Sequence, residues 1–127
     1  MSILNPYLLV GAGGALGAML RYGLSLVSLR SSFPFMTFFT NVTGAVLIGF
    51  IVGTASRNTQ MSQGLLLFLK TGLCGGYTTF STFSLETLSL FEKKQYGTGC
   101  LYAGLSLAAC IFGVWLGKIL AGVGRGA

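Results

Sequence analysis

Hydroxyl-bearing and aromatic side chains concentrate in one short stretch, inside a segment that is otherwise apolar. The stretch reads Gly75-Gly76-Tyr77-Thr78-Thr79-Phe80-Ser81-Thr82-Phe83-Ser84. Two adjacent glycines cost a helix roughly 1 kcal/mol each relative to alanine. Backbone released from a helix inside hydrocarbon must be buried in protein, line a wet cavity or hold an ion. The pattern predicts a helix interrupted at the two glycines, either for an ion-related purpose or as a packing kink.

Other polar side chains could meet this stretch from the second and fourth apolar segments. Asn41 is the one strongly polar residue of the second segment, and Thr37 lies one turn before it. An amide NH₂ can bond an anion without trapping it by charge, although an interhelical hydrogen bond is an equal alternative. Tyr102, Ser106 and Cys110 recur every four residues in the fourth segment, and this stripe predicts either packing or a pore wall.

The residue types that perform acid–base or metal chemistry are almost missing. The chain has no His and no Asp, and its acids are Glu86 and Glu92. Acid–base pairs, metal clusters and His-activated nucleophiles are thereby nearly excluded, so we expect no enzyme. The net charge of +6 comes from basic residues scattered at segment ends. This distribution favours anchoring of loops over binding of nucleic acid.

The elements that must position these residues are membrane helices. The chain has 127 residues, of which 53% are hydrophobic and 20 are glycine. A span needs about 20 apolar residues, so we expect a single all-α transmembrane domain over residues 1–127. Its four predicted spans cover about 7–28, 35–55, 64–91 and 96–120, and the third span carries the break.

Glycines and two basic residues give further expectations for the spans. Gly13 and Gly17 form a small-xxx-small face in the first span, which predicts close approach of another helix. Arg21, in the second half of that span, either snorkels to the interface or lies at a water-filled entrance that attracts anions. Lys70, in the first half of the third span, is expected to anchor the helix by snorkelling.

The basic residues are balanced between the two sides of the predicted bundle. One side, which holds both termini, carries Arg57, Lys70, Lys118 and Arg125, and the other carries Arg21, Arg30, Lys93 and Lys94. The positive-inside rule then gives no orientation. We therefore hypothesise insertion in both orientations and an antiparallel homodimer. Two helix breaks would meet at its centre, where unpaired carbonyls form an oxygen cage for a small hard cation.

Three motifs give the chain a family resemblance over essentially its whole length. They are the glycine-rich first span ending in Arg21-Tyr22, the segment Thr40-Asn41-Val42-Thr43-Gly44, and the long stretch from Gly75 to Glu86. With these motifs the chain resembles the Fluc (CrcB-type) family of bacterial fluoride channels. The stretch from Gly75 to Glu86 is the specific one, and the other two are weaker alone.

The resemblance implies a function and a set of residues. It implies a passive fluoride-selective channel in the bacterial inner membrane, a dual-topology homodimer with two pores. It implies a structural sodium ion at the dimer centre, held by the backbone carbonyls of Gly75 and Thr78. Fluoride would meet Phe80, Phe83, Asn41, Thr37, Ser81, Thr82, Tyr102 and Ser106, and Arg21 would lie in the vestibule. Cys110 stands where a further hydroxyl is expected, a departure from the family pattern.

Two other functions compete with this interpretation. A small proton-coupled exporter of cations or drugs has the same size and is often dual-topology, but it depends on an acid in the first span, where this chain has Arg21. A non-transporting scaffold subunit would use the polar residues only to join helices.

Overall fold

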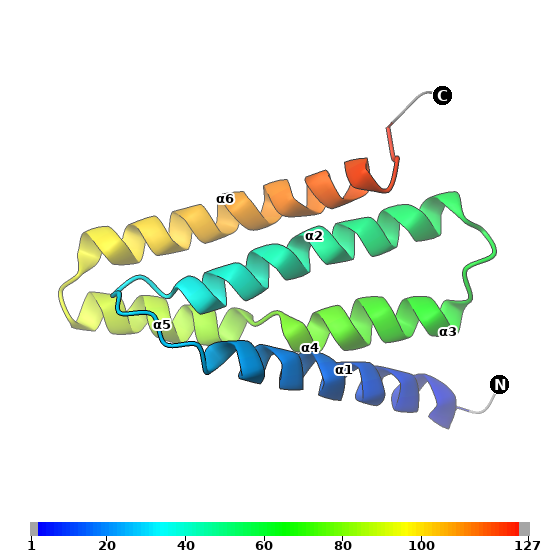
Figure 1. Ribbon diagram of the computed structural model, residues 1–127, viewed down its shortest axis with the longest axis horizontal. Coiled ribbons are helices and arrows are strands. Elements are labelled where there is room, and N and C mark those ends of the chain that lie inside the picture. Colours follow the sequence, from blue (N-terminus) through cyan, green and yellow to red (C-terminus); the bar gives the residue numbers. More distant parts are fainter. Residues whose placement is uncertain (1–2, 125–127) are drawn as a thin grey trace.

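The chain folds into long helices that run back and forth along one axis. The computed structural model describes residues 3–124, and every regular element in that range is helical. Helix α1 spans Leu4–Ser25, α2 spans Phe35–Arg57 and α6 spans Tyr96–Leu120, while residues 63–92 form the third membrane segment in pieces. Both ends of the chain lie at the same end of the bundle (Figure 1).

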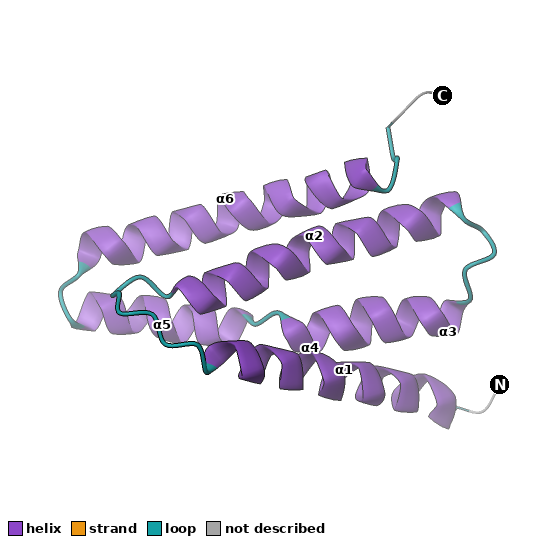
Figure 2. Cartoon of the chain, viewed as in Figure 1, coloured by secondary structure: helices purple, strands orange, loops and turns teal. Residues whose placement is uncertain are grey.

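The third segment is interrupted, as the sequence predicts, but not at the two glycines. It consists of α3 (Gln63–Leu66), the π-helix η1 (Leu67–Cys74), α4 (Gly75–Tyr77) and α5 (Phe80–Glu92). Figure 2 shows the non-helical link between α4 and α5. Thr78 and Thr79 are extended there, with φ/ψ of −88°/157° and −148°/118°. The expected break at Gly75–Gly76 was therefore placed too early by about three residues.

Gly76 is needed for close packing and not for the break. A Cβ on Gly76 would collide with the backbone of Gly14, and one on Gly17 would collide with the carbonyl of Leu73 and the amide of Tyr77. These contacts bring α1 against η1 and α4 at backbone distance, as the small-residue face of the first span predicts.

A second glycine-lined contact joins α2 to α6, which lie side by side in Figure 1. A Cβ on Gly49 would meet the backbone of Val114, and one on Gly117 would meet the backbone of Val46 and Phe50. Helix α5 packs on α6 as well. The fold thus contains two close helix pairs, α1 with η1–α4 and α2 with α6, and α5 joins the second pair.

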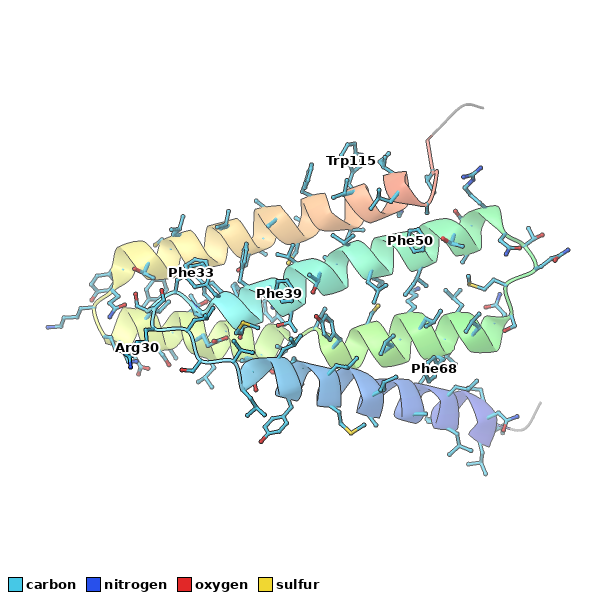
Figure 3. The ribbon with its side chains drawn as sticks, in the orientation of Figure 1. Arg30, Phe33, Phe39, Phe50, Phe68 and Trp115 are labelled. Atoms are coloured by element: carbon cyan, nitrogen blue, oxygen red, sulfur yellow. The ribbon has the colours of Figure 1, made fainter. Side chains whose placement is uncertain are left out.

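The outer surface of this bundle is suited to lipid. Helices α1, α2 and α6 are each long and apolar enough to cross a membrane. Large apolar side chains point outward, and Trp115 projects away from the other helices in Figure 3. The chain is a multi-pass membrane protein. Helix α1 begins and ends three residues before the expected limits of 7 and 28, and Arg125 lies outside the described residues.

Candidate functional site

An open groove runs between the α2–α6 pair and the half-helix formed by η1 and α4. Its volume is about 600 Å³, and its lining is mainly apolar. Among the residues singled out from sequence, it brings together Asn41, Gly75, Thr78, Phe80, Phe83, Ser106 and Cys110. Thr37, Ser81, Thr82, Tyr102 and Arg21 do not line it. The groove therefore collects the break and four of the eight expected pore residues, namely Asn41, Phe80, Phe83 and Ser106.

Asn41 holds the break from α2. Its Oδ1 accepts a hydrogen bond of 2.8 Å from the amide of Thr79, and its Nδ2 donates one of 3.1 Å to the carbonyl of Thr79. The amide of Thr79 would otherwise donate to the carbonyl of Gly75 in a continuous helix. Both alternatives left open for Asn41 are compatible with this geometry, because one N–H of its amide group remains available.

Arg21 holds the break from α1. Its Nε donates a hydrogen bond of 3.2 Å to the carbonyl of Gly76, which the break deprives of its helical donor, the amide of Phe80. The side chain is half-buried. Arg21 is thus joined to the break itself, a contact that the sequence did not indicate.

A third contact comes from a pair that the sequence analysis did not single out as functional. The hydroxyls of Tyr77 and Thr43 are 2.9 Å apart, which joins the last residue of α4 to α2.

On the other side of the break, the hydroxyl of Thr79 accepts a 3.2 Å bond from the amide of Thr82 and caps α5. The sequence signal for this cap was a threonine placed three residues before the residue whose amide it accepts in the first turn of the helix.

These contacts leave a defined set of carbonyls without donors. Within residues 3–124, no hydrogen bond reaches the carbonyls of Gly75, Tyr77 and Thr78. Gly75 and Thr78 also line the groove. Unwound carbonyls at the C-terminal end of a half-helix carry partial negative charge and suit a hard cation such as sodium. In the described part of the chain, no cluster of three or more His, Cys, Asp or Glu side chains offers another metal site.

The two phenylalanines occupy different environments. Their ring centroids are 5.5 Å apart. Phe80 is 73% exposed, whereas Phe83 is 9% exposed and packs on Tyr102 with a centroid distance of 5.2 Å. Both rings line the groove, but Phe83 belongs to the packed core of the chain, whereas Phe80 is exposed at the start of α5.

Two further polar groups lie along α6. Ser106 is 5% exposed, and its hydroxyl is buried with no hydrogen-bond partner in the described part of the chain. Tyr102 is fully buried, and its hydroxyl donates to Glu86 Oε1 at 3.3 Å, with Thr37 beside both groups. Glu86, one of the two acids of the sequence, therefore lies in the same polar cluster as Tyr102.

Comparison with known proteins agrees with this architecture. Residues 8–118 match the family model described as "CrcB-like protein, Camphor Resistance (CrcB)". The chain belongs to this family.

The curated relatives carry a consistent name. A protein of Rhodopseudomonas palustris named "Fluoride-specific ion channel FluC" is 45% identical over 117 residues, which cover 90% of this chain and 94% of the relative. "Fluoride-specific ion channel FluC 1" of Listeria monocytogenes is 45% identical over 91% of this chain and 99% of its own length. A namesake from Azobacteroides pseudotrichonymphae is 40% identical over 93% and 97%. The family is thus one of ion channels and not of enzymes.

Proposed function

We propose that the chain is a passive, fluoride-selective channel that lets fluoride leave the bacterial cytoplasm through the inner membrane. The names of its relatives give the ion. The observation that carries the proposal is the open groove, which gathers two carbonyls of the break, two aromatic rings and a buried hydroxyl. Within residues 3–124 these carbonyls and this hydroxyl have no hydrogen-bond partner. A proton-coupled exporter is disfavoured, because such a transporter depends on an acid in its first span and α1 contains none.

The channel would form from two antiparallel copies of the chain. The groove is apolar and open along one side of the chain, and the Phe80 side chain in it is largely exposed. A second copy would cover this surface. The equal division of basic residues between the two sides of the bundle supports opposite orientations, because it removes the usual bias in insertion.

Sodium would bind where the two breaks meet. The carbonyls of Gly75 and Thr78 fit this ion because they lack donors within the described residues and line the groove. Bound sodium would supply fixed positive charge close to the permeating anion. Asn41 and Arg21 bind the neighbouring peptide groups at Thr79 and Gly76, which keeps the helix interrupted beside these carbonyls.

Two pores per dimer would carry fluoride along neutral donors. Phe80 and Phe83 would present ring edges, which bear the positive end of the aromatic quadrupole. Asn41 would offer its remaining N–H, and Ser106 its unpaired hydroxyl. Such donors replace the water around a tightly hydrated anion without a full charge that would trap it. The remaining donors that we assign to the pathway are Thr37, Ser81, Thr82 and Tyr102, and Arg21 lies at its vestibule.

Efflux from proteoliposomes tests the proposal. Liposomes loaded with fluoride and containing the purified chain should release it on addition of a potassium ionophore, as read by a fluoride electrode. Phe80→Ile should stop release while the protein stays folded and dimeric, and replacement of sodium by N-methylglucamine should reduce release. Absence of fluoride release from the wild-type chain would refute the channel. Proton-coupled uptake of an organic cation would instead favour an exporter, and no flux of either kind a scaffold.

A further inference from the structure

Within residues 3–124, Lys70 is the one charged residue that lines the groove. It lies in η1, and its side chain is exposed. The residues that η1, α4 and the break contribute to the groove are Lys70, Thr71, Cys74, Gly75 and Thr78. This spacing of i, i+1, i+4, i+5 and i+8 describes one helical face. Lys70 therefore continues the face that carries the free carbonyls, toward the end of the bundle that holds both termini.

Lys70 lies in the first half of the third segment and borders the groove. It stands seven residues after Gln63, where the third segment begins, which at 1.5 Å per residue is about 10 Å along the helix. Its exposed side chain borders the groove together with Phe80 and Phe83. The long stem of Lys70 can reach the interface from this depth, so its place on the groove, and not its depth, indicates a further role.

A second copy that closed the groove completely would bury an ammonium group without a partner, at a large cost. Neither of the two acids of the chain lines the groove, where it could pair with Lys70. Glu86 is bonded to Tyr102 within its own chain, and Glu92 is the last residue of α5, at the end of the bundle opposite Gln63. An antiparallel partner would bring its own Glu92 to the end that holds Lys70, but outside the lining of the groove. Because no acid within residues 3–124 lines the groove, water is what would solvate the ammonium group at this end when the rest of the groove is covered.

We propose that Lys70 lies in a water-filled mouth of the fluoride pathway and raises the local fluoride concentration there, a role like the one assigned to Arg21 at the vestibule. This inference rests on the proposed channel function. A charge in a cleft with low-dielectric walls concentrates counter-ions and speeds their entry, and salt screens the effect.

The test is the dependence of fluoride efflux on ionic strength. Proteoliposomes would be assayed at low, constant fluoride and sodium, with an impermeant salt varied from 10 mM to 1 M. Lys70→Gln should lower the initial rate about fivefold at 10 mM, the effect of one unit charge acting over about 4 Å of water. The loss should fall below about twofold at 1 M, where the Debye length shrinks from about 30 Å to about 3 Å. Lys70→Arg should restore the rate.

Lys118→Gln is the matched control, because Lys118 is exposed in the last turn of α6 at the same end but does not line the groove. Equal rates for Lys70→Gln and Lys118→Gln at low salt would overturn the proposal. So would a loss that is the same at every ionic strength, since that indicates a structural role. A Glu92→Gln variant that reproduces the loss would indicate an ion pair between copies. Absence of fluoride efflux from the wild-type chain would refute the channel function itself. If the wild-type chain releases fluoride and Lys70→Gln releases it at the same rate, only the role of Lys70 is refuted.

Discussion

The two halves of the third membrane segment are held in place by different means. The first half, η1 with α4, lies against α1 through backbone-to-backbone contacts at Gly17 and Gly76. The second half, α5, lies against α6 through side chains, chiefly the Phe83 ring on Tyr102 and the bond from Tyr102 to Glu86. Small residues allow the first contact and large ones fill the second.

This difference has a consequence for the break between the halves. Because each half is fixed to a different partner helix, neither can rotate to restore a continuous helix without losing its own contacts. Some of the freed peptide groups are then bonded by side chains, those of Thr79 by Asn41 and the carbonyl of Gly76 by Arg21. We conclude that the break is a product of packing on both sides and of specific donors between them.

The largest effect is expected from a substitution that disrupts the contact of the first half with α1. Gly17→Val would drive a side chain into the carbonyl of Leu73 and the amide of Tyr77, and should cost about 3 kcal/mol or more, since rigid backbone cannot move aside. Thermal unfolding in detergent and the dimer fraction on size exclusion measure this loss. Gly11→Val on the same helix is the control, because a Cβ there meets open space. Equal melting temperatures for the two variants would contradict the close contact.

The next effect tests the second half. Phe83→Ala should destabilise the protein by about 3 kcal/mol, because a buried ring leaves a cavity against Tyr102. Phe80→Ala should cost less than about 1 kcal/mol, since that ring is mostly exposed within the subunit. Both variants should lose fluoride efflux. A Phe80→Ala variant as unstable as Phe83→Ala would show that the two rings are structurally equivalent.

A smaller effect concerns the junction of the halves. Asn41→Ala removes both bonds to Thr79 and should cost about 2 kcal/mol, because the peptide groups of Thr79 then lose their partners. Hydrogen exchange at the Thr79 amide should accelerate. The control is Asn58→Ala, which removes a single exposed loop bond to the amide of Gln60. Unchanged protection at Thr79 would mean that Asn41 does not secure the break.

The smallest effect concerns the hydrogen bond between Tyr77, at the end of α4, and Thr43. Tyr77→Phe removes the hydroxyl that meets Thr43, and should lower stability by about 1 kcal/mol. Tyr96→Phe is the control, because Tyr96 is exposed and stacks on Phe91 through its ring. Similar melting temperatures for both variants would remove the Tyr77–Thr43 bond from the contacts that hold the first half.

Several features follow from the sequence because they depend on local composition. Apolar length predicts the spans, since hydrocarbon demands runs of about 20 residues. The glycines at 13 and 17 predict a close helix contact, which the structure confirms. A break near Gly75 is also predictable, because its residue types weaken a helix. The family resemblance rests on the same local motifs and is confirmed by the match over residues 8–118.

Other features were decided by the tertiary structure. The break lies at Thr78–Thr79 and not at the glycines, because Asn41 on another helix supplies donor and acceptor there while Gly76 is held against Gly14. The π-helical form of η1 has no cue in the sequence either, since its fit against α1 is a matter of packing.

The same division applies to the side chains of the site. The sequence determined that this is a four-segment membrane protein with an interrupted third segment, few acids and a row of neutral donors, because those properties reside in residue types and their spacing. It could not separate Phe80 from Phe83, or tell that Lys70 faces the groove, because identical or similar side chains acquire different roles only from the neighbours that the fold places around them.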